Sequence, residues 1–158
     1  MIHGIHHIGL HTPNIDQMAR FYSDAFGFLP VGGEMRWRDS RAMDRCMGVE
    51  ASAGRIVMLR AGNCYLELFE FASPKGRDAQ PLHPQDHGYT HLCIGVTDLL
   101  TEKKRLEAAG MTFPDELYDG GESRAIYGRD VDGNIVELFE TGTTDPFRLS
   151  ELTGFKFK

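Results

Sequence analysis

The order of apolar and polar residues near the N-terminus predicts a strand followed by a helix. Residues 4 to 11 alternate as expected for a half-buried strand. Asn14 can then cap the start of a helix, and Gly27 can end it. The helix itself is indicated by apolar residues that recur at helical spacing, namely Met18, Phe21, Tyr22 and Ala25.

The rest of the chain predicts the same order of elements twice. Two strands, at residues 55 to 60 and 64 to 71, complete the first half. The second half is predicted to contain a strand, a helix and two further strands, at residues 89 to 96, 98 to 109, 124 to 130 and 134 to 140. We interpret each half as a coarse β-α-β-β-β unit, of which these ranges locate the first strand, the helix and the last two strands, and this predicts an α+β fold.

The two halves are also similar in amino-acid sequence. The run from His7 to Ile15 aligns without a gap with the run from His91 to Leu99. Further on, the sequence Glu-Leu-Phe-Glu occurs at residues 67 to 70 and again at residues 137 to 140. Such self-similarity indicates two copies of one supersecondary unit.

Each copy carries a histidine early and a glutamate late, at His7 and Glu67 and at His91 and Glu137. A duplicated unit can bring two of each together across its pseudo-twofold axis, and these are the side chains that bind a divalent metal. The alternation of a strand places Glu70 on the other face from Glu67. An alternative is that the two glutamates form ion pairs with the duplicated arginines Arg60 and Arg129.

Length and composition fit a small enzyme of one domain. We expect a single domain over residues 1 to 158, made of a module at about residues 4 to 72, a linker at 73 to 87, a module at 88 to 141 and a tail at 142 to 158. The formal net charge of −6 gives no basic footprint for nucleic acid. We expect no membrane association, because no apolar run approaches about 18 residues, and we expect a cytoplasmic location.

Three cysteines agree with a reducing compartment, because they are odd in number and have no paired spacing. They are Cys46, Cys64 and Cys93. Cys64 and Cys93 lie in strand-like runs and are interpreted as buried apolar residues. In the tail, Phe147, Phe155 and Phe157 are candidates to pack on the body or on a second chain.

The first half contains an insertion of about 14 residues. Gly27 lies 28 positions before Arg55, whereas the equivalent Gly110 lies only 14 positions before Arg124. One interpretation is an amphipathic surface helix. The other is a flap over the site that binds an anionic substrate group, because guanidinium matches a carboxylate or phosphate bidentately. The candidate substrate-binding residues are Arg36, Arg38, Arg41 and Arg45.

Taken in order, these motifs resemble the vicinal oxygen chelate superfamily of glyoxalase I, methylmalonyl-CoA epimerase, extradiol dioxygenases and fosfomycin and bleomycin resistance proteins. The resemblance covers about residues 4 to 141 and rests on the strand at His7, Phe26-Gly27, Leu66-Glu67-Leu68, Thr90-His91-Leu92 and the run from Asp130 to Leu138. It implies tandem βαβββ modules whose mixed sheets curl around one divalent metal ion, Ni, Co, Zn, Mn or Fe, often in a homodimer.

Within this superfamily, the ligand set favours a reaction class. Bacterial glyoxalase I uses one histidine and one glutamate from each module, which carries over to His7, Glu67, His91 and Glu137. Extradiol dioxygenases have two histidines and one carboxylate around iron, with no ligand at the position of Glu67. The resemblance therefore favours a metal-dependent lyase or isomerase of the glyoxalase type.

The implied mechanism is abstraction of a proton next to a carbonyl, through an enediolate held by the metal. Glu137 is the favoured base, and Glu67 serves the opposite face of a small-molecule substrate. Two alternatives stay open: an Fe(II)-dependent extradiol ring-cleaving dioxygenase, and a resistance protein that binds a small molecule.

Overall fold

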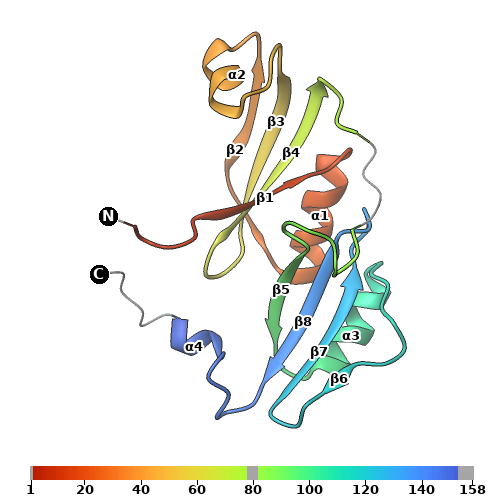
Figure 1. Ribbon diagram of the computed structural model, residues 1–158. Coiled ribbons are helices and arrows are strands. Elements are labelled where there is room, and N and C mark those ends of the chain that lie inside the picture. The colour runs from red at the N-terminus through yellow and green to blue at the C-terminus, as the bar shows by residue number, and fades with distance from the viewer. Residues whose placement is uncertain (1, 78–81, 153–158) are drawn as a thin grey trace. The chain divides into compact units, whose positions relative to one another are not determined.

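The computed structural model describes residues 2 to 77 and 82 to 152. The chain divides into two compact units, Met1–Ala79 and Gln80–Lys158. Each unit contains one four-stranded mixed sheet and a helix that packs on it (Figure 1). The predicted α+β fold with two βαβββ modules is confirmed.

The first unit carries six elements, β1 (His7–His11), α1 (Ile15–Phe26), β2 (Leu29–Arg38), α2 (Arg41–Met47), β3 (Ala53–Arg60) and β4 (Tyr65–Ser73). Its sheet has the order β1-β4-β3-β2, in which β1 is parallel to β4 and the other neighbours are antiparallel. The β-α-β order brings β1 beside β4, the last strand of the unit, so the early histidine and the late glutamate share one strand pair.

The second unit repeats this arrangement with β5 (His91–Val96), α3 (Leu99–Ala108), β6 (Tyr118–Asp119), β7 (Ser123–Arg129), β8 (Ile135–Thr141) and α4 (Leu149–Leu152). Its sheet has the order β5-β8-β7-β6, with β5 parallel to β8. Of the tail aromatics, Phe147 is exposed, whereas Phe155 and Phe157 lie outside the described residues. No helix in the described ranges is long and apolar enough to cross a membrane.

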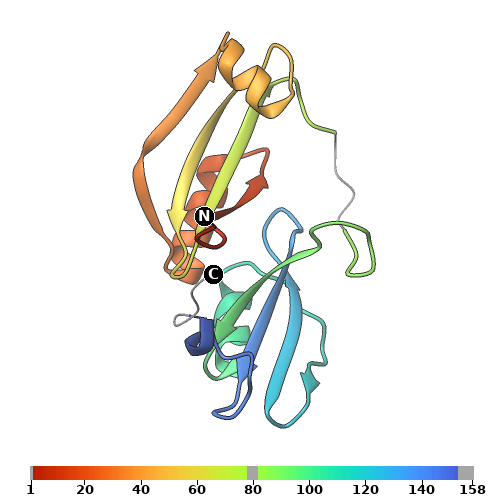
Figure 2. The ribbon, with the colours of Figure 1, turned by 60° about the vertical axis from the view of Figure 1, so that its left-hand side comes forward.

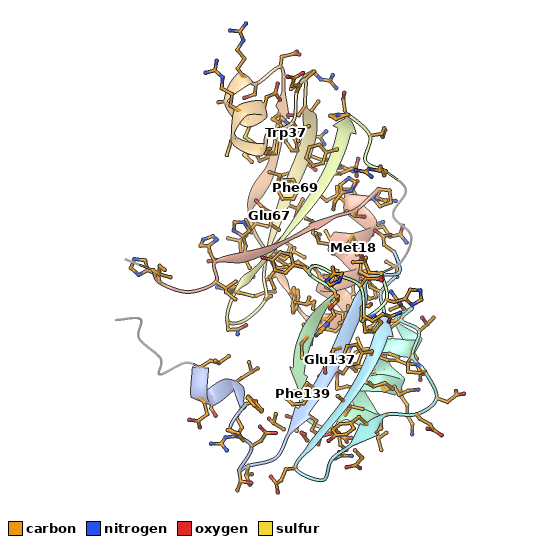
Figure 3. All side chains as sticks on the ribbon, in the orientation of Figure 1. Met18, Trp37, Glu67, Phe69, Glu137 and Phe139 are labelled. Atoms are coloured by element: carbon orange, nitrogen blue, oxygen red, sulfur yellow. The ribbon has the colours of Figure 1, made fainter. Side chains whose placement is uncertain are left out.

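The main helix of the first unit begins and ends where its sequence predicts. Asn14 accepts a hydrogen bond from the Gln17 backbone N–H, and Gly27 ends the helix in a left-handed conformation. The apolar side of α1 is buried, with Met18 completely inaccessible (Figure 3). This burial separates a helix-covered face of the sheet from an opposite face.

Strand alternation distributes β4 and β8 over these two faces. Leu66 and Leu68 are buried on the face that α1 covers, and Val136 and Leu138 are buried in the same way in the second unit. Glu67 and Glu137 therefore lie on the opposite faces of their sheets. Figure 3 marks them on β4 and β8.

The second glutamate of each repeat has a structural role. Glu70 accepts a hydrogen bond from the Ile15 backbone N–H at 2.8 Å, and Glu140 accepts one from the Leu99 N–H at 2.9 Å. Each carboxylate thus satisfies a free N–H at the start of a helix. Each also pairs with an arginine, Glu70 with Arg55 and Glu140 with Arg124.

The insertion is a strand followed by a short helix, so the interpretation as a surface helix holds for its second part only. Residues 29 to 38 form β2, which pairs with β3, and only Arg41–Met47 are helical (Figure 2). Methionine and arginine favour helices, but pairing with β3 and burial of the Trp37 ring override this preference. Trp37 donates a hydrogen bond to the Ser52 hydroxyl at 2.8 Å.

Helix α2 is attached to the body through Asp44. Its carboxylate accepts hydrogen bonds from the Ser52 hydroxyl at 2.5 Å, from the Ser52 backbone N–H at 2.9 Å and from the Ala51 N–H at 3.1 Å. The bonds from Ser52 are the main reason that the pKa of Asp44 lies below its ordinary value. The insertion is therefore a fixed edge strand followed by an anchored helical turn.

Candidate functional site

The first unit brings together the two side chains that its sequence singles out. His7 lies on β1 and Glu67 on β4, on the face opposite α1, because Gly9 is the register partner of Glu67 and His7 is two residues away on the same face. Nε2 of His7 is 3.2 Å from Oε2 of Glu67. The Glu67 side chain is only 15% exposed, so its charge requires a partner.

The second unit repeats this pair. Nε2 of His91 on β5 is 3.2 Å from Oε2 of Glu137 on β8, and the Glu137 side chain is 12% exposed. The structure does not pair these two glutamates with Arg60 and Arg129, which was the alternative. Arg129 donates to the Gly133 carbonyl oxygen, and Arg60 is exposed.

A neighbouring residue holds each imidazole by its other nitrogen. Nδ1 of His91 lies 2.9 Å from the Thr90 hydroxyl oxygen, and Nδ1 of His7 lies 2.9 Å from Nδ1 of His6. Fixing Nδ1 in this way directs Nε2 toward the glutamate in both units. His6 therefore supports His7, and His11 packs its ring against Phe71.

The donor set fits half of a divalent metal site in each unit. Two ligand atoms that each lie about 2.1 Å from one ion, at about 90° to each other, are about 3.0 Å apart. The 3.2 Å separations between imidazole nitrogen and carboxylate oxygen are close to that value. Within residues 2 to 77 and 82 to 152, three or more histidine, cysteine or acidic side chains do not gather into a complete cluster. Each unit offers one pair.

Two residues beside Glu137 were not predicted as part of the site. Cys93 is the register partner of Glu137 on β5, and Tyr127 is its partner on β7. Both therefore lie next to Glu137 on the same face of the sheet, and the Tyr127 ring packs edge-on against His91, with centroids 5.1 Å apart. The sequence contained a signal for Cys93, because the ungapped alignment of the two copies places this cysteine at the position of Gly9.

The ionisation of these two donors is suppressed. Desolvation, followed by the charge of Glu137, raises the pKa of Cys93 to about 12. The same causes raise the pKa of Tyr127. Both groups are therefore protonated donors at neutral pH. The interpretation of Cys93 as a buried apolar residue is incorrect, because it is exposed on the face that carries Glu137.

Aromatic side chains extend the open face of the first sheet beyond Glu67. Phe69 and Phe71 stack with ring centroids 6.0 Å apart, and Trp37 meets Phe71 edge-on at 5.3 Å. Phe69 follows Glu67 on the same face of β4 (Figure 3). An aromatic surface next to the pair can hold the apolar parts of a small molecule.

The candidate arginines do not gather at this face. Arg36 is the register partner of Arg55, on the face that carries Glu70, and Arg38 shares that face by alternation. Arg36 also forms an ion pair with Glu34. Arg41 and Arg45 are exposed on α2. A role in substrate binding stays a prediction, and the geometry favours Arg41 or Arg45 over the two strand arginines.

Comparison with known proteins gives one family. The profile of the Glyoxalase/Bleomycin resistance protein/Dioxygenase superfamily matches residues 4–138. A 2-epi-5-epi-valiolone epimerase from an Actinomyces species is 31% identical over 156 residues, covering 90% of this chain and 82% of that protein.

Solved structures agree on the fold. A glyoxalase family protein from Bacillus cereus superposes with a TM-score of 0.77 at 20% identity, over 87% of this chain and 93% of that one. The fosfomycin resistance protein FosX from Listeria monocytogenes superposes with a TM-score of 0.60 at 19% identity, over 96% and 99% of the two chains.

Proposed function

The chain belongs to the Glyoxalase/Bleomycin resistance protein/Dioxygenase superfamily, and we propose that within it the chain is a metal-dependent isomerase that epimerises a carbon next to a carbonyl. The observation that carries this proposal is the pair of equal half-sites, His7 with Glu67 and His91 with Glu137, each at 3.2 Å. A second glutamate at the position of Glu67 favours proton transfer over ring cleavage, which needs only two histidines and one carboxylate around iron.

The two pairs together supply four ligands, two neutral nitrogens and two carboxylates, for one divalent ion. Such a set suits Mn²⁺, Co²⁺, Ni²⁺, Zn²⁺ or Fe²⁺. When bound, the ion supplies Lewis-acid polarisation of a substrate carbonyl, which lowers the pKa of the neighbouring C–H. The four ligands come from one chain or from two chains of a homodimer, and sedimentation with and without Mn²⁺ distinguishes these arrangements.

The residues of the chain perform the proton transfer. Glu67 and Glu137 are the two carboxylates on the open sheet faces, and an inversion needs one group to take the proton from one face and another to return a proton to the opposite face.

The relative of 31% identity supports this reaction type, because its name describes an epimerase. We therefore propose 2-epi-5-epi-valiolone, the compound in that name, as the first substrate to test. FosX shares the fold of this chain at 19% identity.

The test is proton exchange in deuterated water. The protein, loaded with Mn²⁺ or Co²⁺ and freed of oxygen, is incubated with 2-epi-5-epi-valiolone, and NMR follows inversion and the entry of deuterium next to the carbonyl. We expect both with wild type, and loss of inversion with Glu67→Gln. Strict dependence on Fe²⁺ and O₂ with cleavage of a catechol would support a dioxygenase instead. Tight binding of fosfomycin or bleomycin without turnover would support a resistance protein.

A further inference from the structure

The two half-sites are equal in their metal-facing atoms but unequal in their surroundings. Glu137 has Cys93 as its partner on the parallel strand and Tyr127 as its partner on the antiparallel strand. Glu67 has Gly9 and Met58 at the corresponding positions. The second glutamate therefore has two hydrogen-bond donors as cross-strand neighbours, and the first has a glycine and a thioether in their place.

The donors act on the pair as a whole. The Tyr127 hydroxyl and the Cys93 thiol come from the two strands that border Glu137, and the Tyr127 ring packs edge-on against His91. His91 is held at Nδ1 by the Thr90 hydroxyl. Donors on both neighbouring strands can hold the carboxylate from two sides, and a carboxylate held in this way loses less conformational freedom when it binds an ion.

We propose that Cys93 and Tyr127 are positioning residues that hold Glu137 as the stronger metal ligand. Glu67, flanked by Gly9 and Met58, is then the more mobile ligand, so it takes the place of Glu137 as the favoured base. This inference rests on the proposed function, since it assigns different tasks to the two glutamates of that site. It also predicts that the His91–Glu137 pair contributes more to the affinity for metal than the His7–Glu67 pair does.

The test is the affinity of the whole protein for Mn²⁺, measured by titration calorimetry. Mn²⁺ is the chosen probe because this hard ion favours carboxylate over thiolate, so the Cys93 sulfur does not compete as a ligand. Tyr127→Phe and Cys93→Gly are each expected to weaken binding by about 10-fold to 100-fold. Cys93→Ser keeps a donor and is expected to restore binding to within about 3-fold of wild type. Met58→Leu is the matched control and is expected to bind like wild type.

A donor introduced beside Glu67 should increase the affinity for Mn²⁺, and a misfolded variant would not show such an increase. A Cβ at Gly9 would meet only the Phe69 ring, at 3.8 Å, so a side chain fits there. Gly9→Ser places a donor beside Glu67 and is expected to strengthen Mn²⁺ binding by about 3-fold to 10-fold. Thermal unfolding in EDTA should be the same for wild type, Gly9→Ser and Cys93→Ser, because the proposed effect acts on the ion.

A comparison of the two glutamates completes the test. Glu137→Gln is expected to weaken Mn²⁺ binding at least about 10-fold more than Glu67→Gln. Equal losses in these two variants, or wild-type affinity in both Tyr127→Phe and Cys93→Gly, would overturn the inference and leave the proposed function standing. Absence of Mn²⁺, Co²⁺, Ni²⁺ and Zn²⁺ binding by wild type would overturn both.

Discussion

The Arg55 guanidinium donates a 2.9 Å hydrogen bond to Oε2 of Glu70, the same oxygen that accepts the Ile15 N–H at the start of α1. Arg55 also pairs with Asp16 of α1 and with Glu34 of β2. One arginine thus joins a helix and two further strands of the first sheet. Burial opposes ionisation of Glu70, but the bonds from Arg55 and Ile15 outweigh it and lower the pKa of Glu70.

This lowered pKa fixes the sign of the acid response. A carboxyl group whose pKa is lower in the folded than in the unfolded state stabilises the fold above its unfolded pKa, 4.5 for glutamate. That stability is lost as pH falls through the folded pKa. We expect Glu70→Gln to cost about 1.5 to 3 kcal/mol at pH 7, as for hydrogen bonds to charged groups.

The measurement is urea unfolding followed by the fluorescence of Trp37, the single tryptophan, which lies in the first unit. Wild type should lose stability between about pH 5 and pH 3, and Glu70→Gln should lose less over that range. The exposed Glu116, changed to glutamine, is the control and should behave like wild type. An acid response of Glu70→Gln as steep as that of wild type would contradict this role.

The close contact of Gly54 with Trp37 gives a second prediction. A Cβ at Gly54 would lie 2.5 Å from both the Glu70 carbonyl oxygen and Cη2 of Trp37. Gly54→Ala is therefore expected to destabilise the protein by about 1 to 3 kcal/mol and to change the Trp37 emission. Gly33→Ala is the control, because a Cβ there would meet no atom within 4 Å. Equal stability of the two variants would show that the Trp37 packing relaxes freely.

The placement of the arginines gives a third prediction. Arg36→Ala and Arg38→Ala are expected to leave kcat/KM within about 2-fold of wild type, because both side chains lie on the face opposite Glu67. Arg41 or Arg45, if it binds an anionic group of the substrate, should contribute about 1.5 to 3 kcal/mol to kcat/KM. A large loss in Arg36→Ala alone would reverse this assignment. The measurement uses the substrate identified by deuterium exchange.

The repeat predicted which histidine lies beside which glutamate. Strand alternation separated Glu67 from Glu70, and the structure places them on opposite faces, one beside His7 and one beside Arg55. Local signals also predicted the bounds of α1, because its cap at Asn14 and its end at Gly27 involve neighbouring residues. These features depend on periodicity and on short-range hydrogen bonds, which a single sequence displays directly.

Other features depend on contacts between distant residues. Strand β2 was not predicted, because its stability comes from pairing with β3 and from the space that Gly54 leaves for Trp37. Tyr127 was missed because its place beside Glu137 follows from the register of β7 and β8. Register is set by the whole sheet, so the pattern within one strand does not give it.

Our central proposal is that His7, Glu67, His91 and Glu137 bind one divalent metal ion. Its most direct test is elemental analysis of the untagged protein and of His91→Ala, with His83→Ala as a control in an exposed loop. We predict one equivalent of metal per chain in wild type and His83→Ala, and loss of most of it in His91→Ala, with the β-rich circular dichroism spectrum retained. An unchanged metal content in His91→Ala would contradict the claim.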